Sequence, residues 1–184
     1  MSAIDGSKIL LGVTGGVSAY KSCYLVSHLI RENCQVEVIM TDSAQKFVGE
    51  SSFSALTGKK VHTDIFNAPE GVHALHIYLS DWADVIVVAP ATANTLAKLS
   101  FGLADNLLTA TVLASRCPVL LAPAMNANMW NNTIVQENIA KLKGAGFSFV
   151  GPGAGRLACG TEGSGRMAEP EEIFNAIEQL LQNR

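Results

Sequence analysis

Uncharged polar side chains follow two apolar runs in this sequence, at the points where buried strands would end. Pro90–Thr95 (PATANT) places two hydroxyls and an amide after VIVVA, and Ala122–Trp130 (APAMNANMW) places asparagines, methionines and a tryptophan after PVLL. A tight turn needs only Gly, Ser or Asp, so these larger groups call for another explanation. Hydroxyls and amides donate and accept hydrogen bonds without carrying charge. They suit the polar edge of a flat ring better than a metal ion.

A third segment, Gly12–Tyr20 (GVTGGVSAY), follows the first apolar run and is suited to an anion. Its glycines and small hydroxyls would leave backbone N–H groups able to hold a phosphate where a helix begins. The glycine spacing matches neither GxGxxG nor a P-loop, and a plain tight turn is the alternative. Met40–Ala44 (MTDSA) adds hydroxyls and Asp42, for a phosphate, a ribose or a helix cap. Together the four segments predict a site for a mononucleotide, with a dinucleotide less favoured but not excluded.

Apolar runs and helical patterns alternate along the chain, as they do in α/β proteins. The predicted strands are Lys8–Val13, Gln35–Met40, Asp84–Ala89, Pro118–Ala122 and Phe147–Val150. The predicted helices are Ala19–Glu32, Ala44–Thr57, Thr92–Ala114 with a break near Gly102, Thr133–Lys143 and Glu171–Leu181. Continuous apolar strands between helices favour a single Rossmann-like, doubly wound parallel sheet. Such sheets bind ligands beyond the carboxyl ends of their strands.

Length and composition narrow the class of protein. The 184 residues predict one domain spanning 1–184, and a net charge of −3 offers no basic patch for nucleic acid. The first residues lack a signal-peptide pattern, and no run approaches the roughly 20 apolar residues of a membrane span. The four cysteines lack metal-binding spacing, which favours no metal and a reducing, cytoplasmic compartment.

Residues 151–169 (GPGAGRLACGTEGSGRMAE) carry six glycines and no periodic pattern. A segment of this length without periodicity is typically a lid over a site, or disordered. We therefore expect a flexible, glycine-rich substrate lid at 151–169.

Four motifs in order resemble those of the FMN-dependent cysteine decarboxylases, in particular the phosphopantothenoylcysteine decarboxylases of coenzyme A biosynthesis. Along the chain they are His76 in HIYLSDWAD, PATANT, PAMNANMW and ACGTEGSGRM, and the resemblance covers nearly the whole chain. Thr161 stands where the family frequently has Asp after Cys-Gly. Because no synthetase domain follows, the resemblance implies a free-standing decarboxylase.

The resemblance implies a role for particular residues. Asn126, with Ala124 and Met125 beside it, would hold the substrate carboxylate next to the flavin. His76 would handle a proton and orient the substrate sulfur, and Cys159 would be the final proton donor. The FMN-binding residues would be Gly15, Gly16, Val17, Ser18, Thr41, Phe47, Thr92, Ala93, Asn94 and Thr95.

The resemblance also implies a reaction and an assembly. The substrate would be 4'-phosphopantothenoylcysteine, whose thiol is oxidised to a thioaldehyde before CO2 leaves. The resulting enethiolate is then reduced to give 4'-phosphopantetheine with no net redox change. The family forms homotrimers, sometimes assembled into homododecamers, with FMN at subunit boundaries.

The sequence is also compatible with other functions. A peptidyl-cysteine decarboxylase would share two motifs and stop at the enethiol, and a flavin prenyltransferase would lack the pairing of His76 with Asn126. A non-catalytic regulatory subunit typically departs at catalytic positions or carries an acidic tail. Met129 and Trp130 are explained as well by a core as by a cavity wall or a subunit contact. The other three histidines, His28, His62 and His73, are expected to be structural or on the surface.

Overall fold

A parallel sheet of five strands forms the centre of the molecule in the computed structural model, which describes residues 4–156 and 162–183. The strands are β1 (Lys8–Val13), β2 (Gln35–Met40), β3 (Val85–Ala91), β4 (Val119–Pro123) and β5 (Ser148–Phe149). They lie in the order β2-β1-β3-β4-β5. The chain thus winds outward from β1 in both directions, and β1 and β3 flank the point where the strand order reverses. The predicted doubly wound α/β fold is confirmed.

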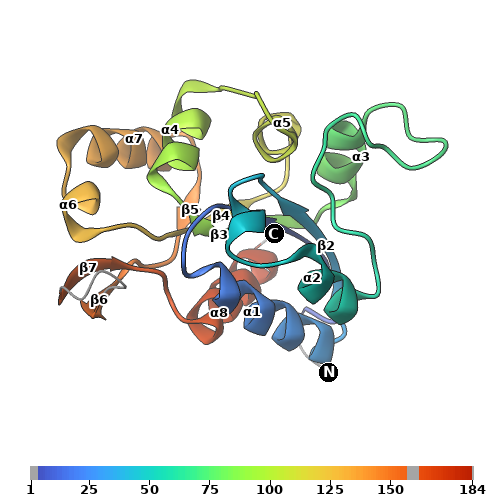
Figure 1. Cartoon of the computed structure of the whole chain (residues 1–184), viewed down its shortest axis with the longest axis horizontal. Coiled ribbons are helices and arrows are strands. Elements are labelled where there is room, and N and C mark those ends of the chain that lie inside the picture. Colours follow the sequence, from blue (N-terminus) through green and yellow to red (C-terminus); the bar gives the residue numbers. More distant parts are fainter. Residues whose placement is uncertain (1–3, 157–161, 184) are drawn as a thin grey trace.

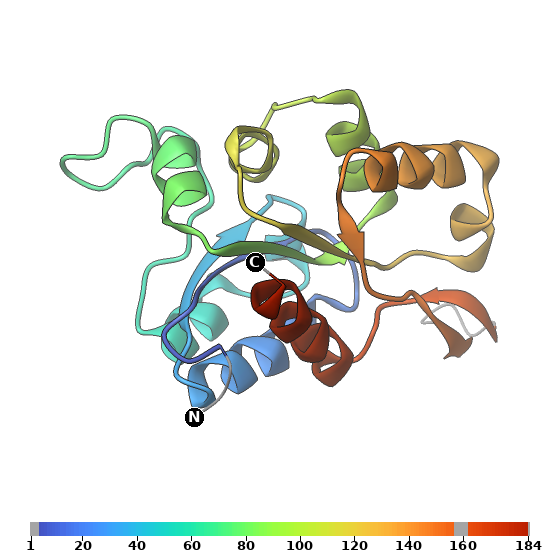
Figure 2. The ribbon, with the colours of Figure 1, turned by 180° about the vertical axis from the view of Figure 1, so that it is seen from behind.

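Helices cover both faces of the sheet (Figure 1). One face carries α1 (Ala19–Arg31), α2 (Glu50–Thr57) and α8 (Pro170–Gln182), which Figure 2 shows from behind. The other carries α3 (Leu75–Trp82), α4 (Ala93–Phe101), α5 (Leu107–Ala114) and α7 (Thr133–Gly144). The short helices η1 (Ala44–Lys46) and α6 (Ala127–Trp130) follow β2 and β4.

Alternating side chains of the strands fill two separate cores. In β1, Ile9 and Leu11 pack in the core beneath α1 and α8, whereas Leu10 packs in the core beneath α3 and α5. Each of these three side chains is completely buried. Successive side chains of a strand point to opposite faces, so a strand buried on both sides must be apolar throughout. This requirement is why the strand predictions lie within one or two residues of the structure.

Helix α3 was not predicted, and one predicted helix is divided. HIYLSDWAD, for which no helix was predicted, forms most of α3, because Leu75 and Leu79 are four residues apart and both are fully buried on one helix face. The helix predicted at Ala44–Thr57 is divided, since Gly49 has extended backbone between η1 and α2. Elsewhere the predicted helices agree with the structure within two residues, including the break near Gly102.

The glycine-rich segment contains regular structure in its described parts. β6 (Gly153–Arg156) pairs antiparallel with β7 (Glu162–Arg166), and this hairpin lies beside α6 (Figure 1). The sequence did not predict these two strands, and the flexibility of the segment stays a prediction. Within the described ranges, no helix has both the length and the apolar character that crossing a bilayer requires.

Candidate active site

A cavity of about 1110 Å³ opens at the carboxyl ends of the parallel strands. Its wall includes residues from the exits of β1, β2, β3 and β4, as expected for a ligand site at a topological switch point. Twelve of the predicted site residues line it: Gly15, Gly16, Val17, Ser18, Thr41, Thr92, Ala93, Asn94, Thr95, Ala124, Met125 and Asn126. Sequence segments that are more than 100 residues apart thus meet around one space.

The turn after β1 is held against its neighbours on both sides. A Cβ atom on Gly15 would collide with Ser43 after β2, so only glycine allows the two exits to approach this closely. The Thr14 hydroxyl donates to the Pro90 carbonyl at 2.7 Å and accepts from the Thr92 backbone N–H at 3.2 Å. The turn leads into the N-terminus of α1, where the helix dipole and backbone N–H groups favour an anion.

The turn after β3 presents hydroxyls and an amide in fixed positions. Thr92 caps α4, since its Oγ1 accepts from the Thr95 backbone N–H at 3.3 Å and lies 3.0 Å from Thr95 Oγ1. Asn94 stays exposed on the same first turn of the helix. This turn can therefore hydrogen-bond the edge of a polar ring without bringing a charge to it.

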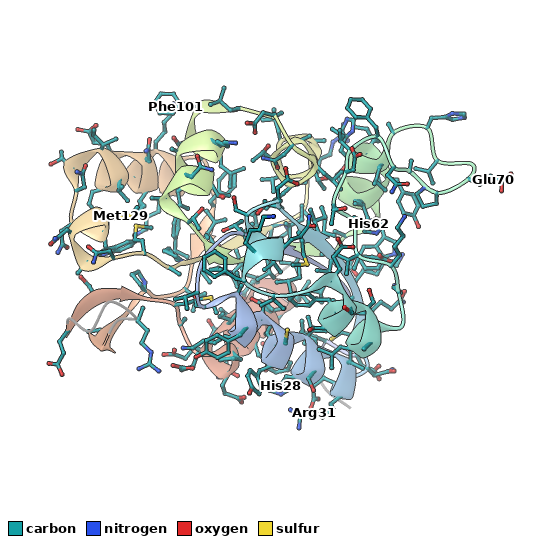
Figure 3. The ribbon with its side chains drawn as sticks, in the orientation of Figure 1. His28, Arg31, His62, Glu70, Phe101 and Met129 are labelled. Carbon is teal, nitrogen blue, oxygen red and sulfur yellow. The ribbon has the colours of Figure 1, made fainter. Side chains whose placement is uncertain are left out.

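The exit of β4 explains the unusual APAMNANMW sequence. The Met125 N–H donates to the Gly165 carbonyl at 2.9 Å, which attaches this exit to β7. Asn126 caps α6, and its Oδ1 accepts from the Asn128 N–H at 2.8 Å. This hydrogen bond occupies the amide oxygen, and Nδ2 is the atom of Asn126 that can donate a hydrogen bond to a carboxylate. Met129, on α6 near the hairpin (Figure 3), adds an apolar side chain to the cavity wall.

Several charged and apolar residues of the wall were not predicted. Lys21 is 7% exposed on the first turn of α1, and Arg166 ends β7. Lys98 donates to Asp105 at 2.6 Å, and this hydrogen bond holds the pKa of the Asp105 carboxyl below its usual value. Leu107 and Leu108, at the start of α5, also line the cavity. Only Arg166 had a signal in the sequence, because it belongs to the ACGTEGSGRM motif.

Two predicted residues, His76 and Phe47, lie away from this cavity, and a third, Cys159, is not among the described residues. His76 lies on α3, which packs on α5 and is separated by α5 from α4 and α6 (Figure 1). Phe47 follows η1 and is 52% exposed. Neither residue is part of the cavity wall. Cys159 lies outside the described residues, so the roles predicted for all three stay predictions.

Two of the remaining histidines have structural contacts. His28 stacks on Phe174 with 4.0 Å between ring centroids, and His62 Nε2 lies 2.9 Å from Glu37 Oε2. Burial raises the pKa of Glu37, but hydrogen bonds from His62 and Lys59 outweigh it and leave the pKa lowered. Within the described part of the chain, no group of three His, Cys, Asp or Glu side chains could hold a metal ion.

The cavity is suited to a mononucleotide with a flat ring. A glycine turn at a helix N-terminus lies beside Lys21 for a phosphate, and the Thr92–Thr95 turn offers neutral hydrogen bonds for a ring edge. Leu107, Leu108 and Met125 supply apolar surface for the faces of a ring. The fold and the cavity together define an α/β protein with a nucleotide-type site at the carboxyl edge of its sheet.

The chain belongs to the flavoprotein family, whose model, described as "Flavoprotein", matches residues 2–182. It is 45% identical over 176 residues to the coenzyme A biosynthesis bifunctional protein CoaBC of Bacillus subtilis, covering 96% of this chain and 43% of that protein. The chain therefore spans less than half the length of this relative.

Two solved structures are similar throughout. The FMN-dependent cysteine decarboxylase SpaF is 35% identical with a TM-score of 0.85, covering 98% of each chain. A PPC decarboxylase mutant complexed with pantothenoylaminoethenethiol is also 35% identical with a TM-score of 0.85, covering 96% of this chain and 99% of that one.

Proposed function

We propose that this chain is an FMN-dependent decarboxylase that converts 4'-phosphopantothenoylcysteine (PPC) to 4'-phosphopantetheine in coenzyme A biosynthesis. The observation that carries the proposal is the convergence of an anion turn, a neutral ring-edge turn and Asn126 on one cavity. The similarity to CoaBC and to a PPC decarboxylase supports the choice of substrate. The reaction acts on a free thiol, so we also propose a reducing, cytoplasmic compartment.

The cofactor is FMN, with its phosphate at the Gly15–Ser18 turn and its ring edge at Thr92–Thr95. Thr41, at the exit of β2 on the other side of β1, contributes a further hydroxyl. When bound, FMN supplies both the hydride acceptor and the hydride donor that the two halves of the reaction require. The apolar side chains of α5 and the Met125 region exclude water from the ring faces.

Asn126 binds the substrate carboxylate through Nδ2, while the Asn128 N–H keeps the amide oxygen turned away. A neutral amide is better suited to this task than arginine. The carboxylate leaves as CO2, so a strong salt bridge would stabilise the ground state more than the transition state. Ala124 and Met125 form the surrounding wall.

His76 completes the site from a second copy of the chain. Its location on α3, away from its own cavity wall, is the reason for this proposal, together with the exposed apolar side chains of Ile77 and Tyr78 on the same helix. We propose a homotrimer, alone or within a homododecamer, in which His76 and Phe47 reach a neighbouring cavity. His76 then orients the sulfur and receives its proton.

Cys159 supplies a proton after CO2 has left. A thiol with a reference pKa near 8.5 is mostly protonated at neutral pH, yet acidic enough to give up its proton. Cys159→Ser raises the pKa of the donor by several units, so the enethiolate should no longer be reduced. We place Cys159 in a lid formed by residues 151–169.

Turnover of PPC by the purified, flavin-loaded protein tests the function, with CO2 and thiol products measured separately. Wild type should release CO2 and form phosphopantetheine. Cys159→Ser should release CO2 and accumulate the enethiol, while the control Cys117→Ser behaves as wild type.

Two of the alternatives give different results in this experiment. A wild type that stops at the enethiol would instead be a peptidyl-cysteine type of decarboxylase. A wild type that binds flavin but releases no CO2 would be a regulatory subunit. Loss of all CO2 release in Cys159→Ser would assign this residue to binding or folding.

A further inference from the structure

One carboxylate, that of Glu169, lies behind the cavity wall between α1 and β7. Its Oε1 accepts from Lys21 Nζ at 2.8 Å and from Arg166 Nη2 at 2.7 Å. Both cations line the cavity, whereas Glu169 does not. Lys21 has 9% of its side chain exposed, so its charge is almost removed from water and depends on this partner.

The same carboxylate begins α8. Glu169 and Glu172 form a capping box, in which the Glu169 side chain accepts from the Glu172 N–H and Glu172 Oε2 accepts from the Glu169 N–H at 2.7 Å. The hydrogen bond from Lys21 lowers the pKa of Glu169 more than burial raises it, so the carboxyl stays ionised at neutral pH. Glu169 therefore joins α1, β7 and α8 through one group.

Glu169, Lys21 and Arg166 form an ionic cluster. Gly165, the residue before Arg166, connects this cluster to the exit of β4. Gly165 accepts the Met125 N–H at 2.9 Å, and a Cβ atom on Gly165 would collide with the Met125 carbonyl oxygen. The backbones of Gly165 and Met125 are thus in direct contact, with no side chain between them. A shift of β7 would have to move Met125, and with it Asn126.

We propose that Glu169 is a positioning residue, which holds β7 against α1 and thereby sets Met125 and Asn126 at the correct place over the cavity. This inference rests on the proposed function, in which Asn126 binds the reacting carboxylate. A misplacement of about 1 Å at a distance from the chemistry can cost up to 100-fold in rate. Glu169 therefore affects the rate of turnover without contacting the substrate.

Glu169→Ser tests this role while preserving the helix cap. Serine is as good an N-cap as a carboxylate, but it is too short to reach Lys21 and Arg166. Glu171→Ser is the matched control, because Glu171 lies in the first turn of the same helix. Its side chain is 70% exposed, and its Oε2 lies 3.3 Å from His28 Nδ1 rather than near the cavity wall. Both variants lose one negative charge from the same turn.

Two readouts are measured on the flavin-loaded protein. We expect Glu169→Ser to lower kcat for CO2 release about tenfold with KM little changed. We also expect faster hydrogen exchange at the Met125 amide, whose bond to Gly165 would open more often. Glu171→Ser should match wild type in both measurements. Glu169→Gln, which keeps the length and the capping acceptor but not the charge, should give a smaller loss in the same direction.

A double-mutant cycle with Lys21→Met separates positioning from general destabilisation. If the pair acts as a unit, Lys21→Met combined with Glu169→Ser should be no slower than the worse single variant. Equal kcat and equal Met125 exchange in Glu169→Ser and Glu171→Ser would overturn the inference. If wild type releases no CO2 from PPC, the proposed function fails, while the exchange comparison still decides the role of Glu169.

Discussion

The carboxyl edge of the sheet and helix α3 carry two halves of the predicted site, and only the first is assembled within one chain. The predicted residues at the exits of β1, β3 and β4 all line one cavity, whereas His76 on α3 does not. Adjacent parallel strands end at the same edge, so their exits must meet. The position of α3 depends instead on its packing against α5 and on the long connection before it. One chain therefore builds a binding site, and in the proposed homotrimer His76 would complete it from a second chain.

The largest effect is expected at Asn126, in the half that the chain builds alone. Asn126→Asp places a negative charge beside the substrate carboxylate and should reduce CO2 release by about 100- to 1000-fold. Bound FMN should be retained, because the groups proposed to hydrogen-bond it lie at the exits of β1, β2 and β3. Asn128→Asp is the control, since Asn128 is exposed on α6 outside the cavity wall and should keep normal turnover. Rapid turnover by Asn126→Asp would remove this residue from the site.

Mixing two inactive variants tests whether His76 acts on the cavity of a neighbouring chain. His76→Asn has an intact cavity, and Asn126→Asp has an intact His76, so a trimer assembled from both should contain some complete sites. With random assembly in equal amounts, half of the cavities are intact and half of the neighbours supply His76. About a quarter of the wild-type activity should return.

His73→Asn is the control for the loss of activity in His76→Asn. It should be active without mixing, because His73 is exposed in the connection before α3. Mixed trimers that form, as judged by mass spectrometry, but stay inactive would mean that His76 and Asn126 act within one chain or that His76 is not catalytic.

The sequence predicted the sheet because a strand buried on both faces has no freedom to be polar. Val85, Val87 and Ala89 pack in one core while Ile86 and Val88 pack in the other, and this produces the continuous run VIVVA. The exits of the predicted strands indicated the segments that form the cavity wall, and the family resemblance selected twelve residues within them. These segments meet because adjacent parallel strands end at the same edge of the sheet.

The sequence did not predict the elements whose contacts are made by backbone or by distant charges. β6 and β7 have no apolar pattern, and Gly165 is required by the backbone of Met125 rather than by its own strand. Lys21 resembles any helix-surface lysine until Glu169, 148 residues away, is placed beside it. Such contacts depend on tertiary structure that no local pattern records.

A smaller effect is expected from one hydrogen-bonding group at the ring-edge turn. Asn94→Ala removes an exposed amide from the first turn of α4 and should weaken FMN binding about tenfold, as one lost hydrogen bond of 1–3 kcal/mol allows. Titration of the apoprotein with FMN, followed by flavin fluorescence, measures this change. Asn131→Ala, which alters an exposed residue outside the cavity wall, should bind FMN normally. Equal affinities in the two variants would exclude Asn94 from the cofactor site.

The smallest effect is expected at Cys34, which precedes β2 at the end opposite the cavity. Burial, followed by the nearby Glu32, raises the pKa of the Cys34 thiol to about 11, and Sγ donates to the Ile4 carbonyl at 3.4 Å. In the unfolded chain the pKa is near 8.5. Between these two values the unfolded chain loses the proton while the folded chain keeps it. Stability should therefore be fully present below pH 8.5 and fall as pH rises toward 11, by at most about 1.4 kcal/mol per pH unit.

Cys34→Ala tests this dependence through its slope rather than its absolute stability, which the smaller side chain also lowers. Urea unfolding of the apoprotein between pH 8 and 10 should show a shallower loss of unfolding free energy in Cys34→Ala than in wild type. Identical slopes would show that Cys34 titrates alike in the folded and unfolded chains. FMN affinity should be the same in both proteins. Cys34 lies at one edge of the sheet, and the groups of the same chain that are proposed to bind FMN lie at the other edge. A change in affinity would mean that the two edges of the sheet are coupled.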